Sequence, residues 1–202
     1  MSARLKFAVL LALSVAQLGA AGWSIARYET ILASGTPYRI QTAPVDPADA
    51  FRGWYVAVQP SIALAEPIAR ETEQLLQSIG SGRGRAYVRL TTDAEGFARA
   101  AEILQDAPEN GDYLEINRAW PTWRPRPDQP AQSERAGYTL LFSFDRYYMN
   151  EAAAPTAQQR YFQAARRNAD TRAWLTVRVK DGIGVIEGLF IEGVPIEEVV
   201  RR

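Results

Sequence analysis

The residue types that could carry chemistry are restricted from the outset, because the 202-residue chain contains no cysteine and no histidine. Cysteine nucleophiles, disulfides, thiolate zinc sites and the histidine base of a hydrolase triad are therefore excluded. Basic and acidic residues number 23 each, and this balance does not indicate nucleic-acid binding. The remaining polar residues form no catalytic, metal-binding or cofactor-binding motif, so we expect a protein without catalytic activity, metal or cofactor.

The stretch VDPADAFRGWYV, residues 45–56, gathers acidic, basic and aromatic residues at the entry to a predicted strand. Its candidate residues are Asp46, Asp49, Arg52, Gly53 and Tyr55. In one interpretation the aspartates bond to the local backbone, Arg52 pairs with one of them, and Gly53 permits a tight turn. In the other, Asp46, Asp49 and Arg52 form a polar site, although this site lacks a nucleophile and a tuned base.

A second set of candidates, Asp145, Arg146, Tyr147 and Tyr148, follows the predicted strand Tyr138–Phe144. Binding residues often lie on segments held at the ends of strands, which favours a functional interpretation. The alternative is that Asp145 and Arg146 keep the end of the strand solvated and pair with neighbouring residues.

Trp120 and Trp123 lie in a segment, residues 119–137, that contains four prolines and little periodicity. We expect this segment to be a long exposed loop. The two indole rings could then stack on sugars or contact a partner protein, or they could fold back onto the core. We also expect the loop and the end of the strand at Phe144 to form one binding surface.

The N-terminus predicts a membrane segment. Arg4 and Lys6 precede Phe7–Ala26, twenty residues without a charge, which as a helix span about 30 Å, the thickness of a bilayer core. Trp23 and Tyr28 stand where interfacial aromatics belong, which favours an uncleaved signal anchor. Two alternatives are a signal peptide with a cleavage site in residues 24–26 and a buried core helix.

The positive charges at the N-terminus predict the orientation of this segment. Arg4 and Lys6 favour a cytoplasmic N-terminus, so the chain from about Arg27 onward is expected outside the membrane. In a bacterium this describes a single-pass protein of the inner membrane with a periplasmic domain. We therefore divide the chain into an anchor, residues 1–30, and one domain, residues 31–202.

Alternating and helical patterns beyond the anchor predict an α+β domain with two helices, built on a mainly antiparallel curved sheet or barrel-like sandwich of seven or eight strands. Asp181-Gly182 predicts a two-residue turn between the last two strands. The predicted helices are 67–80 and 155–168. The predicted strands include 38–42, 54–59, 86–91, 111–117, 138–144, 173–180 and 183–191. Residues 97–104 are expected to form a further strand, with a short helix as the alternative.

Three segments carry a resemblance to the GDYXXLXY family of membrane-anchored bacterial proteins. The first, Ser34–Val56, resembles the opening of that family, and the GWYVAVQP run keeps Gly53 and Tyr55 of the name motif. In this run Trp54, Val58 and Pro60 replace the aspartate, the leucine and the final tyrosine of the motif. The other two segments are FSFDRYYMNE, residues 142–151, and VKDGIGVIEGLFIEG, residues 179–193.

The resemblance implies a domain tethered to the inner membrane and often encoded beside multispanning membrane proteins, without a particular activity. We therefore expect a non-catalytic domain that binds or assembles with a multispanning inner-membrane protein. The alternative is a protein of the cell envelope that binds or acts on carbohydrate. It would use Trp120, Trp123 and Tyr148 as stacking platforms and, if hydrolytic, a carboxylate pair such as Glu115 and Asp145.

Overall fold

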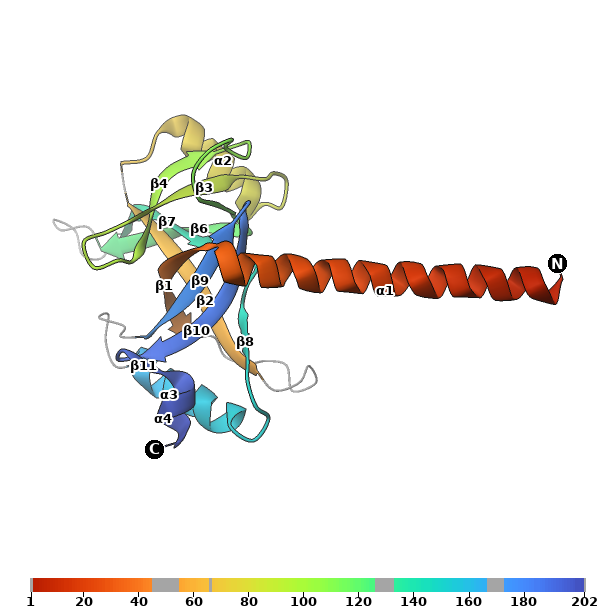
Figure 1. Cartoon of the computed structure of the whole chain (residues 1–202). Helices are drawn as coiled ribbons and strands as arrows, with labels where there is room; N and C mark the ends of the chain where they lie inside the picture. Colours follow the sequence, from red (N-terminus) through yellow and green to blue (C-terminus); the bar gives the residue numbers. More distant parts are fainter. Residues whose placement is uncertain (1, 45–54, 66, 126–132, 167–172, 202) are drawn as a thin grey trace.

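The computed structural model describes residues 2–44, 55–65, 67–125, 133–166 and 173–201 (Figure 1). A long N-terminal helix leads into an α+β domain whose strands pair mostly antiparallel, as the sequence predicts. The helices are α1 (Ala3–Ser34), α2 (Arg70–Gly80), α3 (Ala154–Arg166) and α4 (Ile196–Arg201). The first strands are β1 (Thr36–Pro44), β2 (Tyr55–Ala65), β3 (Tyr87–Thr92), β4 (Ala98–Leu104), β5 (Tyr113–Glu115) and β6 (Arg118–Pro125). They are followed by β7 (Ser133–Leu141), β8 (Arg146–Tyr148), β9 (Ala173–Lys180), β10 (Ile183–Ile191) and β11 (Val194–Pro195).

Helix α1 projects from the domain as a single rod, with the N-terminus at its far end (Figure 1). Its segment Arg4–Ser34 has a mean hydropathy of 1.7 over its most apolar window, and none of that window is buried. The helix is therefore long and apolar enough to cross a membrane. The alternative of a buried core helix is wrong, because side chains such as Leu18 and Trp23 are about three-quarters exposed, at 73% and 75%.

The main sheet has eight strands in the order β11-β10-β9-β1-β2-β7-β6, and β8 pairs with the beginning of β2. Strands β11 and β6 lie at opposite edges, so within the described residues the sheet is open and does not close into a barrel. Alternation places Tyr38, Ile40 and Thr42 of β1 in the core, as predicted. Val56, Val58 and the inward residues of β9 complete the same layer.

A second, three-stranded sheet of order β4-β3-β5 packs beside the main one. Two isolated bridges, Arg39 to Phe97 and Leu114 to Gly182, connect the two sheets. The predicted strands 86–91, 97–104 and 111–117 belong to this layer, so their existence is confirmed, although the last is shorter than predicted. Helix α2 packs against β6, and α3 and α4 pack together at the other end of the domain (Figure 1).

The hairpin of β9 and β10 agrees with the sequence in both strand bounds and turn. Asp181 and Gly182 have φ angles of 51° and 78°, so both turn residues are in the left-handed conformation that a tight hairpin requires. A register shift between Ile186 and Gly188 bends β10 where it passes the base of α1.

The prediction of a long loop at residues 119–137 is wrong for its described parts, 119–125 and 133–137. Residues 118–125 and 133–141 form β6 and β7, which pair from Arg118–Leu141 to Pro125–Ser133. Prolines suggested a loop, but β6 is an edge strand, where a missing backbone N–H is tolerated on the open side. Trp120 and Trp123 are therefore held on a paired strand.

The helices depart from the sequence predictions at their ends. Helix α2 begins at Arg70 and not at Pro67, and its N-cap residue Ala69 makes no side-chain capping bond. Helix α3 begins at Ala154, so Thr156 lies inside the helix and does not cap it. The turn before α3 is instead held by Asn150, whose side-chain oxygen accepts a bond from the Ala152 N–H at 2.9 Å. The short C-terminal helix α4 is not predicted from the sequence.

Candidate functional site

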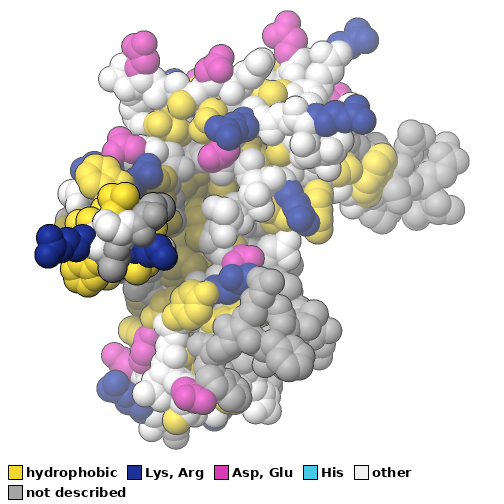
Figure 2. Space-filling model, turned by 90° about the vertical axis from the view of Figure 1, so that its right-hand side faces the viewer, with side chains coloured by type: hydrophobic (Ala, Val, Ile, Leu, Met, Phe, Trp, Pro, Cys, Tyr) yellow, Lys and Arg dark blue, Asp and Glu magenta, His cyan; other side chains and the backbone are white. Residues whose placement is uncertain are grey.

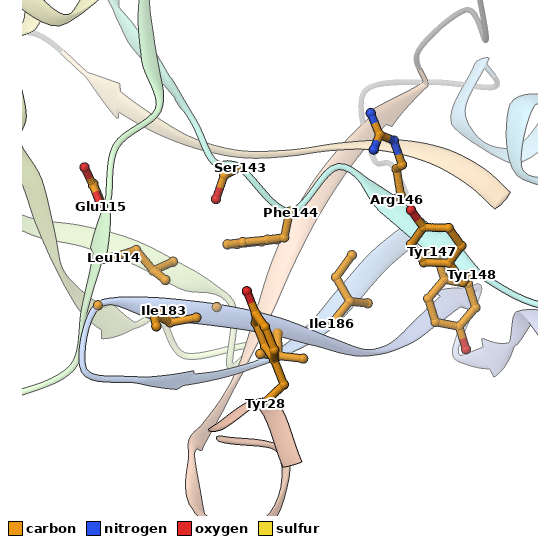
Figure 3. Close-up of a pocket in the computed structure, with 13 residues that line it drawn as sticks. Tyr28, Leu114, Glu115, Ser143, Phe144, Arg146, Tyr147, Tyr148, Ile183 and Ile186 are labelled. Carbon is orange, nitrogen blue, oxygen red and sulfur yellow. The ribbon is translucent and has the colours of Figure 1, made fainter. Parts of the chain in front are cut away.

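A cavity of about 520 Å³ lies at the base of α1 (Figure 3). Its walls come from the last part of α1, from β5, from β8 and the residues before it, and from the β9–β10 hairpin. Figure 2, which views the molecule along α1, shows a hollow beside the helix with hydrophobic side chains on its walls. The side chains that line it include Tyr28, Phe144, Arg146, Tyr148, Ile183 and Ile186.

The base of α1 is held by the β9–β10 hairpin. The Lys180 ammonium donates to the Ser34 hydroxyl at 2.8 Å, and the Arg178 guanidinium donates to the Gly35 carbonyl at 3.2 Å. Arg178 also forms two bonds to the Glu187 carboxylate, at 2.8 and 2.9 Å, which fix its position. Because Ile31 is buried against the domain, Tyr28, one turn earlier, is placed at the cavity.

Strand β8 brings two predicted candidate sets together. Tyr55 pairs with Tyr148 across β2 and β8, and their rings lie 6.0 Å apart. The Arg146 guanidinium lies over the Tyr55 ring at 5.4 Å and 3.6 Å from the Asp145 carboxylate. A hydrogen bond to Tyr148 and the charge of Asp145 raise the pKa of Arg146, so it remains a cation at the rim of the cavity.

Tyr147 contributes to the cavity wall and also connects two elements. Its hydroxyl donates a short hydrogen bond to the Glu197 carboxylate on α4. Burial first, and then this hydrogen bond and the charge of Glu197, raise the pKa of Tyr147 well above its ordinary value. The hydroxyl therefore ties β8 to the C-terminal helix, whereas the neighbouring Tyr148 is 65% exposed and available for contact.

The apolar floor of the cavity is formed by Phe144. Its ring stacks on Phe142 with centroids 5.5 Å apart and an interplanar angle of 6°. It also covers the backbone of Gly184, where a Cβ would stand 2.5 Å from the ring. Figure 3 shows Phe144 directed across the cavity between Ile183, Ile186 and the tip of Tyr28.

The carboxylate pair considered for hydrolysis is not assembled in this cavity. Glu115 lines it and pairs with Arg85 at 3.8 Å, but Asp145 is not among its lining residues. Both side chains are more than half exposed, at 51% and 58%, and both face an arginine. Within the described residues, acidic side chains form no group of three or more that could hold a metal ion.

Trp120 and Trp123 line a separate groove of about 470 Å³ between α2 and β6. They remain 49% and 63% exposed, so the rings do not fold back onto the core. At the register shift between Thr122 and Trp123 the pairing of β6 skips Ala136 of β7. Gln77 and Ser81 supply polar groups on the α2 side.

The two predicted aromatic sets do not form one surface. Tyr148 pairs with Tyr55 at the beginning of β2. Trp120 of β6 pairs with Thr139 of β7, and Thr139 pairs in turn with Ala63 near the end of β2. Eight residues of strand separate Tyr55 from Ala63, which corresponds to roughly 26 Å. The expectation of a joint surface was based on a loop crossing the end of the sheet, and β6 replaces that loop.

Four candidates in the stretch 45–56, namely Asp46, Asp49, Arg52 and Gly53, lie outside the described residues. Tyr55 is the member of that set that the structure places. Sequence reasoning missed the cavity itself, because Tyr28, Phe144 and Ile186 are brought together from distant parts of the chain. The signals that the sequence offered were the candidates Arg146, Tyr147 and Tyr148, which line the cavity, and Tyr28, which the sequence marks as an interfacial aromatic residue.

The fold and the cavity define a class of protein: an α+β domain carried on a helix long and apolar enough to span a membrane. The chain belongs to the GDYXXLXY family. The model of this family, described as GDYXXLXY protein, matches residues 17–189. No curated protein and no solved structure matches the chain significantly. The match includes the second half of α1 together with nearly all of the domain.

The segments that resemble the family meet around the cavity. The second contains Phe144 and β8, and the third contains the turn of the β9–β10 hairpin, and both line the cavity. The first does not line it, but its Tyr55 pairs with Tyr148 of β8. The Val58 N–H donates to the Asp145 carbonyl at 3.0 Å, which holds the name-motif strand against the second segment. The cavity is thus built mostly from the parts of the chain by which the family resemblance was recognised.

Proposed function

We propose that this protein is a non-catalytic domain, tethered to the bacterial inner membrane by α1, that assembles with a multispanning membrane protein on the periplasmic side. The observation that carries the proposal is the position of the cavity, which lies beside the helix that would enter the membrane. A domain held this way keeps the cavity within one or two helical turns of the bilayer surface. Loops and helix ends of another membrane protein are the segments found at that depth.

The composition of the cavity supports a protein ligand. Its walls combine aliphatic and aromatic side chains from β8 and β10 with one cation, Arg146. Protein interfaces are enriched in tyrosine and arginine, and tyrosine supplies a large contact area with few rotatable bonds. Tyr148 is 65% exposed at the rim, so it would lose a large accessible area when a partner binds.

The orientation follows from the charges at the N-terminus. Arg4 and Lys6 precede the apolar run, which supports a cytoplasmic N-terminus and a periplasmic domain. A reporter of topology tests this directly: a periplasm-active phosphatase fused after Arg201 should be active, and a cytoplasmic fluorescent reporter at the same place should be dark. The opposite pattern would reverse the proposed orientation.

Site-specific photo-cross-linking tests the assembly. A benzophenone amino acid replaces Tyr148 in the full-length protein, and membranes are irradiated before purification. We expect one discrete cross-linked product that contains a multispanning membrane protein. The same replacement at Arg83, an exposed residue of the turn after α2, should give none. Equal products from both positions, or none from either, would count against the proposal.

A carbohydrate-binding role is the second candidate, and the groove with Trp120 and Trp123 favours it. Two exposed indole rings beside the amide of Gln77 and the hydroxyl of Ser81 resemble the combination of stacking faces and neutral hydrogen-bonding groups that suits sugars. Retention of the protein on purified peptidoglycan tests this role. Loss of retention in the Trp120→Ala/Trp123→Ala variant, with the Tyr148 cross-link intact, would establish a second binding site.

A further inference from the structure

The membrane-spanning part of α1 has one face that carries hydrogen-bonding side chains. Ser14, Gln17, Ala21, Ser24 and Tyr28 follow a spacing of three and four residues. At about 100° per residue they occupy a sector about 80° wide on one side of the helix. This set is called the polar face below. The remaining residues of the run Phe7–Ala26 are aliphatic or aromatic apart from Gly19 and Gly22, and such residues suit lipid.

Gln17 lies next to the midpoint of the apolar run Phe7–Ala26. Within the described residues, its amide makes no side-chain hydrogen bond, and its side chain is exposed. In hydrocarbon an amide without a partner is costly, because no water is present to bond to it. A single amide at mid-membrane therefore favours contact with another helix that supplies a donor or an acceptor.

The polar face is aligned with the cavity. Its last member, Tyr28, lines the cavity, whereas Trp23, Ala26 and Arg27 line a different hollow around the helix. The axis of a helix packed along the polar face would lie about 9 Å from the axis of α1, which is a typical distance between packed helices. On leaving the membrane it would reach the domain at the opening between Tyr28 and Ile186 (Figure 3).

We propose that α1 pairs, inside the membrane, with a transmembrane helix of the partner through the polar face, and that the outer end of this helix enters the cavity. This inference rests on the proposed function and specifies which part of the partner is bound. The partner helix must offer a hydrogen-bonding side chain at mid-membrane opposite Gln17. It must also have small residues opposite Ala21, so that the two backbones can approach.

The opposite side of α1 provides an internal control. Ala12 lies nine residues before Ala21, which places it about 180° away around the helix. That side includes Gly19 and Gly22, which would allow close approach, but none of these three residues offers a side-chain hydrogen bond. Ala12→Leu and Ala21→Leu are thus the same chemical change on opposite faces.

The experiment uses the full-length protein in its native membranes with the photoreactive residue at position 148. Gln17→Leu and Ala21→Leu should each reduce the partner cross-link about threefold to tenfold, the loss expected for one hydrogen bond or one close contact in a bilayer. Ala12→Leu should leave the yield unchanged. Extraction with alkaline carbonate verifies that every variant remains an integral membrane protein.

The outcomes separate this inference from the proposed function. Unchanged cross-linking in all three variants would overturn the helix pairing while leaving partner binding by the domain intact. Loss of the partner cross-link in the Ala12→Leu variant alone would assign the helix pairing to the opposite face of α1, and it would also overturn the inference. A cross-link to a second copy of this chain would replace the partner helix by a homodimer. No cross-link in the unmodified protein, or a mature chain that lacks residues 1–26, would reject both proposals.

Discussion

At the scale of single residues, buried polar groups join elements that lie far apart in the sequence. The Thr42 hydroxyl lies 2.9 Å from the Tyr161 hydroxyl and accepts a bond from the Gln59 N–H at 3.1 Å. These contacts connect β1, β2 and α3 at one point of the core. A sequence-based reading has no means to find them, because Thr42 and Tyr161 are separated by 119 positions.

The tyrosines make the stability of the domain sensitive to alkaline pH. Burial raises the pKa of Tyr161 to about 12, from an ordinary value of about 10 in the unfolded chain. The unfolded chain therefore loses this proton first. The stability that Tyr161 contributes is complete below pH 10 and is lost as the pH rises from about 10 toward 12. Burial first, and then the hydrogen bond to Asp112, also raise the pKa of Tyr38. Tyr38 therefore contributes to the same loss of stability at alkaline pH.

We expect the Tyr161→Phe variant to lose less unfolding free energy than the unmodified protein as the pH rises. At pH 7 the variant should lose about 1 kcal/mol of unfolding free energy, because the bond to Thr42 is absent. Between pH 9 and pH 11 its stability should fall less than that of the unmodified protein. Urea unfolding of both proteins across this range is the measurement. Parallel declines would show that Tyr161 does not titrate differently in the folded state.

The exposed tryptophans should contribute little to folding. Because Trp120 and Trp123 keep 49% and 63% of their surface accessible, replacing both by alanine should shift the melting temperature by only a few degrees. Replacing the buried Leu140, on the neighbouring strand β7, by alanine should instead cost about 2–5 kcal/mol. If the double tryptophan variant unfolds like the Leu140→Ala variant, the groove belongs to the core and is not a binding surface.

At the scale of elements, the junction of α1 with the β9–β10 hairpin determines which face of the helix meets the cavity. Gly35 allows this junction, since a Cβ there would stand 2.6 Å from the Ile31 carbonyl and 3.1 Å from the Val179 carbonyl. Both obstacles are backbone atoms that cannot move aside easily. The position therefore tolerates no side chain without displacement of α1 or β9.

Gly35→Val should consequently loosen the attachment of α1. The chain has no cysteine, so a pair of introduced cysteines at Thr30 and Asp181 can carry spin labels at unique sites. We expect a narrow distance distribution between the labels in the unmodified background and a broader or longer one with Gly35→Val. Gly19→Val, at a glycine with open space around it, is the control and should leave the distribution unchanged. Identical distributions for Gly35→Val would contradict the role of this junction.

Elements with strong local patterns could be predicted from the sequence, and those determined by pairing could not. The β9–β10 hairpin has alternating residues and a two-residue turn with positive φ, so its strands and turn agree with the prediction. Strand β6 has no such pattern, and its prolines suggested a loop, because the sequence does not indicate that it lies at a sheet edge. Helix α4 is short and depends on burying Ile196.

The candidate site shows the same division. Asp145, Arg146, Tyr147 and Tyr148 could be chosen from the sequence because they follow a strand, and the structure places β8 at the cavity. Their convergence with Tyr28 and the hairpin could not be foreseen. It depends on the pairing of β8 with the beginning of β2 and on the register of the hairpin at the base of α1.

At the scale of the whole molecule, the cavity lies where the long helix α1 joins the domain. The helix presents apolar side chains along most of its length and leaves the domain as a single rod (Figure 1). The domain presents its hollow beside the helix (Figure 2). In the proposed function, tethering would restrict the domain to a thin layer near the bilayer, which would raise the effective concentration of the cavity for segments of other membrane proteins. Weak individual contacts can therefore produce a stable assembly.

Native mass spectrometry of the full-length protein, released from membranes in a mild detergent, tests this account most directly. It measures in one spectrum whether α1 is retained and whether a partner is bound. The account predicts a complex that contains the intact 202-residue chain and a multispanning membrane protein in a fixed ratio. A chain that begins near Arg27 and carries no partner would contradict it.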